Sequence, residues 1–255
     1  MHPVLAVAAF AAGMYAMGKG GAAASGHGIH ATLATAETLL AAPSLLVLAL
    51  SGIPLAEGLG LKPVGARTTR LSILAGAALW AASLGLMSVQ FVIWRPPAEY
   101  LDYFRALHQL LRPQTLGEGV LSVAAIALMP ALCEETLFRG VLFPSFARAG
   151  PFLGLLGSSV FFAAIHIDPL GHFLVFYRLP FAFAVGLGLA TLRLLTGSLV
   201  PSMVAHATLN TITFATVFLS GAASEAMEQP QVLSGALLLL GGGAATGWLF
   251  RALRR

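Results

Sequence analysis

The chain has 255 residues, of which 58% are hydrophobic and only 9% are charged, whereas soluble domains carry about 25% charged residues. This deficit extends over the whole length, so it excludes an ordinary soluble domain and indicates a polytopic membrane protein. The formal net charge is +4, but no basic patch is interleaved with aromatic residues, so we expect no nucleic-acid partner.

A membrane-spanning helix needs about 20 largely apolar residues, and the chain offers about eight such stretches. Between the third and the fourth, residues 95–118 alternate apolar and charged side chains, which is typical of an amphipathic helix lying on the bilayer surface over a substrate entrance. The expected fold class is therefore all-α: a polytopic membrane protein with about eight transmembrane helices and one amphipathic surface helix. The expected spans are residues 3–17, 31–53, 71–94, 120–143, 152–167, 173–192, 199–219 and 232–250.

The first stretch has an alternative interpretation as a signal peptide, because three alanines at positions 22–24 are typical of a cleavage site. Its amino-terminal region contains His2 but no Lys or Arg. The missing positive charge favours a helix that is retained.

Loop charges predict the orientation of the chain. With eight spans, both termini lie on one side, and that side holds eight Lys and Arg residues against four on the other. The positive-inside rule therefore predicts that both termini are cytoplasmic. Arginine outnumbers lysine twelve to two and alanine is abundant, which indicates a GC-rich genome and a bacterial inner membrane. The eight basic residues are Lys62, Arg67, Arg70, Arg148, Arg193, Arg251, Arg254 and Arg255, and the four are Lys19, Arg95, Arg105 and Arg112.

Two adjacent glutamates, Glu134 and Glu135, lie inside the apolar stretch 125–140. A charged side chain at mid-bilayer costs roughly 2.5–3.5 kcal/mol, so such groups are kept when they are paired or used. Glu135 and Arg139 are four residues apart and share a helix face, where they can neutralise each other. Glu134 points elsewhere, so a structural ion cluster explains the other two residues better than it explains Glu134.

Two further polar sites lie on other apolar segments. His166 follows Phe162 by four residues in the fifth segment, and Asn210 follows His206 by four residues in the seventh. Each site has a structural interpretation, since a histidine near a helix end is often a capping group and Asn or His side chains join membrane helices by hydrogen bonds. His108 and His172 lie in loop contexts and are not expected in a site.

Three such sites on three helices suit hydrolysis. A carboxylate with a neutral histidine can hold and deprotonate a water, and a histidine with an asparagine can stabilise the oxyanion. Alternatively, Glu134, His166 and His206 could bind Zn²⁺ and leave one position open for water. These residue types leave both mechanisms open.

The three motifs are Glu-Glu-x-x-x-Arg at residues 134–139, Phe-x-x-x-His at 162–166 and His-x-x-x-Asn at 206–210. Their order resembles the CAAX-protease and bacteriocin-processing (CPBP, or Abi) family of intramembrane proteases, whose relatives include the Ras-converting endopeptidase. The likeness covers roughly residues 119–215 and implies an eight-span helical fold with its site in a polar cavity inside the bilayer.

The resemblance also implies roles for residues. Glu134 and His166 would activate the water, while His206 and Asn210 would stabilise the oxyanion. Members have been described both as metalloproteases and as glutamate-type proteases, so the zinc ligands stay open. Glu135, Arg139 and Phe162 would support the site.

Other chemistry receives less support. The chain has neither a His-Glu-x-x-His nor a Gly-x-Ser-x-Gly motif. Cys133 is expected to be a small hydrophobic residue rather than a nucleophile. Pro180 can break or kink the sixth helix, where Arg178 faces a cavity or a headgroup and could bind a terminal carboxylate. Glu37 is either a partner for a cavity group or a tolerated acid.

We therefore expect an intramembrane endopeptidase that acts on C-terminal tails, sorting tags or leader peptides of a membrane-associated substrate. The alternatives are a non-enzymatic scaffold or bacteriocin-immunity protein, and a transporter or proton relay, which matched broken helices do not support. Residues 1–118 would form the N-terminal helices and the amphipathic loop, residues 119–220 the catalytic core, and residues 221–255 the last helix with its basic tail.

Overall fold

The computed structural model describes residues 1–167, 173–219 and 232–254, and within these ranges every regular element is helical. The predicted all-α class is confirmed. Asp168, His172 and Arg255 lie outside the described residues, as does the acidic segment between the last two helices. In chain order the elements are α1 Pro3–Ala24, η1 Ser25–His27, α2 Ile29–Leu50, α3 Leu55–Leu59, α4 Ala66–Ile93, α5 Ala98–Leu111, α6 Leu116–Ser122, η2 Val123–Leu128, α7 Met129–Glu135, η3 Thr136–Leu142, α8 Phe143–Ala147, α9 Pro151–Ala164, η4 Phe173–Arg178, α10 Leu179–Thr196, α11 Val200–Phe214, η5 Ala215–Leu219 and α13 Val232–Leu253.

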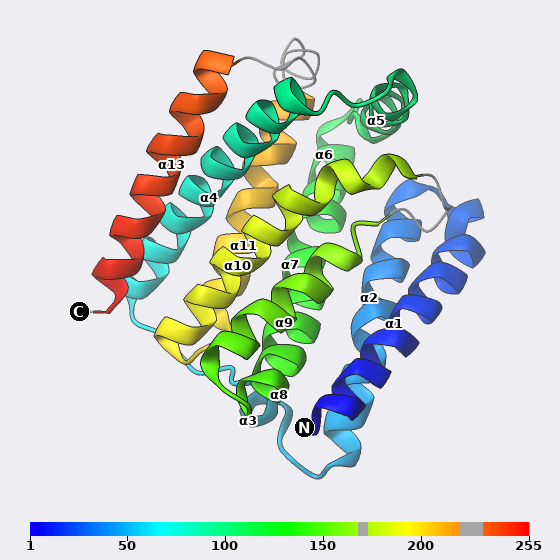
Figure 1. Cartoon of the computed structure of the whole chain (residues 1–255). Coiled ribbons are helices and arrows are strands. Elements are labelled where there is room, and N and C mark those ends of the chain that lie inside the picture. The colour runs from blue at the N-terminus through cyan, green and yellow to red at the C-terminus, as the bar shows by residue number, and fades with distance from the viewer. Residues whose placement is uncertain (168–172, 220–231, 255) are drawn as a thin grey trace.

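The helices form a bundle of the kind expected for an integral membrane protein (Figure 1). In the described part of the chain, six helical stretches are long and apolar enough to cross a bilayer, so the expected count of about eight was only approximate. One expected span is short, because α9 has 14 residues, fewer than a typical spanning helix needs, and α11, which η5 continues, is not among the six. The six stretches are Pro3–His27, Ile29–Leu50, Ala66–Ile93, Leu116–Ala147, Phe176–Thr196 and Val232–Leu253.

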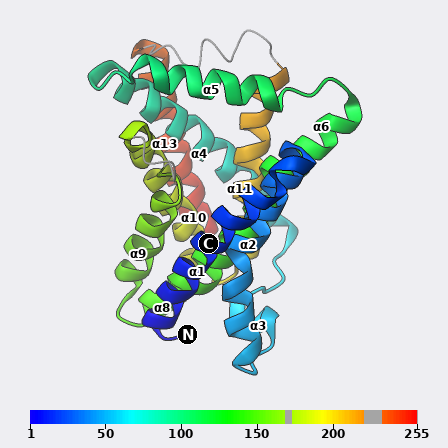
Figure 2. The same ribbon diagram turned by 90° about the vertical axis from the view of Figure 1, so that its right-hand side faces the viewer.

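The amphipathic segment is shorter than expected. Its helix, α5, occupies Ala98–Leu111 and lies across one end of the bundle (Figure 2). Both chain termini lie at the opposite end (Figure 1). The first stretch is longer than expected and packs against α2, and its Phe10 ring contacts Phe138 and Phe161, so α1 is part of the bundle.

The acidic motif lies on one long interrupted helix, Leu116–Ala147. The seven α-helical residues of α7 are bounded by two π-helical stretches, η2 and η3. Pro130 and Pro144 have no N–H to donate to the preceding turn, which explains why the helix widens beside each of them. Short π segments of this kind often occur at functional sites.

Small residues let the core helices approach closely. A side chain at Gly76 of α4 would collide with the backbone carbonyl of Ala205 on α11, and one at Gly85 would collide with α13. Such contacts between backbones are typical of membrane helices, where burial from water contributes little to association. The first contact places α11 against α4 one residue before His206.

Candidate active site

The acidic pair is buried where α7 ends. Glu134 and Glu135 are its last two residues, with 7% and 0% of their surfaces exposed. One oxygen of each carboxylate is buried with no hydrogen-bond partner among the described residues. Since an ionised carboxylate in such surroundings is costly, both groups require compensation by charge or by a ligand.

Arg139 supplies that compensation to Glu135, as the four-residue spacing predicted. Its Nη1 donates to Glu135 Oε1 at 2.7 Å, and both side chains are fully buried. The Nη2 atom donates to the carbonyl of Gly186 on α10 at 2.8 Å, and the guanidinium carbon lies 4.5 Å from the ring centre of Phe162. Arg139 therefore joins the acidic helix to α9 and α10, a connection that sequence spacing did not reveal.

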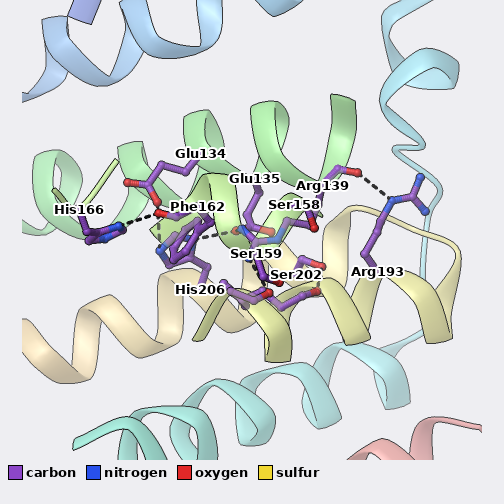
Figure 3. Close-up of polar contacts among 12 residues, drawn as sticks. Glu134, Glu135, Arg139, Ser158, Ser159, Phe162, His166, Arg193, Ser202 and His206 are labelled. Atoms are coloured by element: carbon purple, nitrogen blue, oxygen red, sulfur yellow. Dashed lines mark hydrogen bonds and ion pairs between the residues drawn. The ribbon is translucent and has the colours of Figure 1, made fainter. Parts of the chain in front are cut away.

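His206 lies between the two glutamates (Figure 3). Its Nδ1 is 3.0 Å from Glu135 Oε1, and its Nε2 is 3.9 Å from Glu134 Oε2. The first distance is a hydrogen bond and the second leaves a gap that is too long for one. Glu135 therefore contacts both Arg139 and His206, whereas the sequence had paired it with Arg139 alone.

Phe162 connects the two histidines. Its ring centre is 5.0 Å from that of His166 and 5.8 Å from that of His206. The α9 helix ends at Ala164, so His166 lies in the turn that follows rather than inside the expected helix. Its Nδ1 is 2.9 Å from the Phe162 carbonyl oxygen, a contact that a capping histidine also makes.

These contacts determine which ring nitrogens carry protons. A carbonyl oxygen only accepts, so His166 must donate from Nδ1, and in its neutral form its Nε2 is an acceptor. An ionised Glu135 likewise only accepts, so His206 donates from Nδ1. Its Nε2 can donate only when the ring carries a second proton.

Asn210 lies one helical turn beyond His206 on α11 and is half-buried. Within the described ranges its carboxamide makes no hydrogen bond to protein, so its role in an oxyanion site stays a prediction. Sequence analysis left Glu37 on α2 as either a partner for a cavity group or a tolerated acid. One oxygen of its carboxylate is buried without a hydrogen-bond partner among the described residues. The negative charge of Glu37 repels negative charge on Cys133 and Glu134.

Three buried serines of α9 and α11 and the free cysteine could also act as nucleophiles, but they either donate hydrogen bonds to backbone carbonyls or have no histidine partner among the described residues. The buried Ser158 and Ser159 of α9 donate their hydroxyl hydrogens to carbonyls of the preceding turn, and Ser202 of α11 donates to Leu189. Cys133 is free and half-buried, and no hydrogen bond joins it to a histidine among the described residues.

Among the residues that the structure describes, no three His, Cys, Asp or Glu side chains are placed to hold one metal ion. Of the proposed zinc ligands, His206 has one nitrogen bonded to Glu135 and the other 3.9 Å from Glu134. The three-ligand zinc set of Glu134, His166 and His206 stays a prediction, and the chemistry considered below uses side chains alone.

Comparison with known proteins agrees with the motifs. Residues 116–212 match the family model described as type II CAAX prenyl endopeptidase Rce1-like, which confirms the resemblance drawn from the three motifs. The matched segment begins at α6 and ends within α11, so it includes both glutamates and both site histidines. No curated protein and no solved structure matches the chain.

Proposed function

We propose that this chain, whose residues 116–212 relate it to the CAAX-type intramembrane endopeptidases, hydrolyses a peptide bond with a water held by Glu134 and His166. The observation that supports this most directly is the placement of His206 between Glu134 and Glu135, beside the ring that also contacts His166. Phe162 thus relates His166 to His206 on α11, and His206 relates α11 to the end of α7, which supports one shared site.

The attacking water would donate one hydrogen to the Glu134 carboxylate and one to Nε2 of His166, which the bond to Phe162 leaves as an acceptor. As the water oxygen adds to the carbonyl carbon, its proton passes to Glu134. The Glu134 proton then goes to the leaving nitrogen when the carbon–nitrogen bond breaks. The products are a carboxylic acid and an amine, and the enzyme returns to its starting state.

The developing oxyanion would receive hydrogen bonds from protonated His206 and from Asn210. A doubly protonated His206 would donate from Nε2 while Nδ1 stays bonded to Glu135. One oxyanion donor is worth about 10²–10³ in kcat. Glu135 and Arg139 are positioning residues in this scheme, since they act on the substrate only through His206 and through the attachment to α10.

The substrates we propose are C-terminal tails, sorting tags or leader peptides of membrane-associated proteins, cut inside a bacterial inner membrane. Both termini lie at one end of the bundle, and the excess of Lys and Arg in the loops of that end supports the proposal that it faces the cytoplasm. We propose that residues 1–118 form the N-terminal helices and the amphipathic loop, residues 119–220 the catalytic core, and residues 221–255 the last helix with its basic tail.

The test compares termini of membrane proteins by mass spectrometry in cells that express the wild type, Glu134→Gln or Glu57→Gln. Glu57 is an exposed acid on α3, so its variant is a matched control. We expect a set of cleaved termini that disappears with Glu134→Gln and persists with Glu57→Gln. If a folded Glu134→Gln protein leaves every terminus unchanged, the polar cluster only holds helices together, as in a scaffold or immunity protein.

A further inference from the structure

One face of α2 carries only small or polar side chains. The residues on it follow one another at intervals of four, three, four and three, so they lie along one side of the helix. They are His30, Ala34, Glu37, Ala41 and Ser44, and we call them the polar face of α2. Polar groups are costly in a helix that is long and apolar enough to cross a bilayer, so their alignment calls for an explanation.

The polar face begins near one end of the bundle and continues into its interior. His30 is the second residue of α2 and is half-buried, and its Nε2 lies 2.8 Å from the hydroxyl oxygen of Ser122, the last residue of α6. From there α2 packs against η2, α7 and η3, beside the interrupted helix that carries the glutamates (Figure 1). Ser44, at the far end of the face, is fully buried.

Glu37 approaches Glu134 in the middle of this contact. The negative charge of Glu37 repels negative charge on Glu134 more strongly than Glu135 does, although Glu135 is the next residue in the chain. The charge of Glu37 also acts on Cys133 of the same helix. The two carboxyl groups therefore face each other where α2 packs against α7.

Both carboxyl groups have an oxygen that protein does not satisfy. Oε2 of Glu37 and Oε2 of Glu134 are buried with no hydrogen-bond partner among the described residues, and so is the hydroxyl oxygen of Ser44. Buried polar atoms are nearly always hydrogen-bonded, and buried waters supply the bonds that protein groups do not. Ionised carboxylates only accept hydrogen bonds, whereas a water has two hydrogens and can donate to both acids at once.

The polar face also provides a route to that position. Hydrolysis consumes one water for each bond cut, so a buried site must be refilled after every cleavage. His30 and Glu37 are separated by about 10 Å along the helix, at 1.5 Å per residue. Two or three waters cover that distance at about 2.8 Å for each hydrogen bond. Ala34, which lies between them, adds no bulky side chain to this face.

We propose that Glu37 is a positioning residue that holds a water against Glu134, and that the polar face of α2 supplies the water consumed in each cleavage. The proposal rests on the proposed endopeptidase function and adds the source of its attacking water. Glu37 does not contact the substrate in this scheme. The water that it holds moves between Glu134 and His166 when the products leave, and the next water enters past His30.

Two substitutions separate water binding from packing. Leucine is close to glutamate in size but forms no hydrogen bond, so Glu37→Leu should lower kcat about 10- to 100-fold while KM stays nearly constant. Glu37→Gln still binds water and should keep most of the rate. Since Glu37→Leu removes a buried acid that has no counter-ion, its unfolding temperature in detergent should equal or exceed that of the wild type. The substrate is a peptide whose cleavage the terminal mass spectrometry has identified.

Water beside Glu37 can be detected without turnover. Brief X-ray irradiation of the full chain in detergent produces hydroxyl radicals from water, and mass spectrometry then measures oxidation of Cys133, the single cysteine of the chain. Relative to the half-buried Met203 near the start of α11, Cys133 oxidation should fall several-fold in Glu37→Leu and persist in Glu37→Gln. Thr38→Val is the matched control, because Thr38 is exposed and its hydroxyl donates to the Ala34 carbonyl.

The two measurements can fail independently. Equal Cys133 oxidation in the wild type and in Glu37→Leu would overturn the water site, whatever the cleavage experiment shows. An unchanged kcat in Glu37→Leu would overturn the positioning role, as would a loss of rate that is matched by a loss of unfolding temperature in both variants. A chain that cuts no substrate but shows the expected labelling contradicts the endopeptidase proposal alone.

Discussion

Replacing Glu135 with Gln should change both the stability of the fold and the rate of cleavage, because one Glu135 oxygen contacts Arg139 and His206. Glu135 Oε1 accepts from Arg139 at 2.7 Å and lies 3.0 Å from His206 Nδ1. A glutamine has nearly the same shape but no charge, so it leaves the fully buried Arg139 guanidinium without its counter-ion. Removing one partner of a buried ion pair costs about 3–5 kcal/mol.

The remaining contacts of Arg139 reduce that cost. Its bond to the Gly186 carbonyl and its position 4.5 Å from the Phe162 ring centre persist in the variant. A desolvated cation–π contact contributes about 2 kcal/mol, so we expect a net loss near the lower end, about 2–3 kcal/mol. In a chain of this size that loss corresponds to a fall of roughly 4–12 °C in unfolding temperature.

A second variant separates stability from catalysis. Combining Glu135→Gln with Arg139→Met removes both charges together, so most of the lost stability should return. Cleavage should stay depressed by about 10² or more, because a neutral amide no longer gives the His206 Nδ1–H a charged acceptor that fixes the orientation of the ring. Thermal unfolding in detergent and peptide cleavage measure the two effects. A single Glu135→Gln variant within about 0.5 kcal/mol of the wild type would refute the ion-pair argument.

Three further changes test neighbouring parts of the structure. Asn210→Ala should lower kcat about 10²-fold while the unfolding temperature changes little, since its carboxamide bonds to no described group, and a kcat equal to wild type would remove it from the oxyanion site. Gly76→Val should destabilise by about 1–3 kcal/mol and slow cleavage by pushing α11 from α4, whereas Gly243→Val on an open helix face should do neither. The folded state lowers the pKa of His108, so stability is lost as pH falls from about 6.5 toward the folded-state pKa. His108→Gln should therefore make unfolding less sensitive to acid. Identical pH profiles of stability for variant and wild type would contradict this.

Local spacing was enough to predict the acidic motif's internal pairing. Glu135 and Arg139 are one helical turn apart on one continuous helix, so their contact depends on helix geometry and on little else. The number of spans was less predictable, because α9 is shorter than a typical spanning helix and reveals its place only through the helices around it.

The motif residues themselves were visible in the sequence because charged and polar groups are rare in apolar helices, and the three motifs occur in the order typical of one protease family. Their mutual arrangement was not visible. Glu135 and His206 are 71 residues apart, and no periodicity predicts which face of α11 turns toward α7. The contact of His206 with both carboxylates therefore came only from the folded chain.

What the sequence determined by itself was the class of protein, the polar side chains that carry its chemistry and the contacts within one helix. Only the tertiary structure decided that His206 lies between two carboxylates, that Phe162 joins the two histidines, and that Arg178 faces an apolar cavity under α5. The physical reason is that contacts one turn apart follow from backbone hydrogen bonding. The rotation and depth of one helix against another depend instead on close packing between distant residues, such as Gly76 against Ala205.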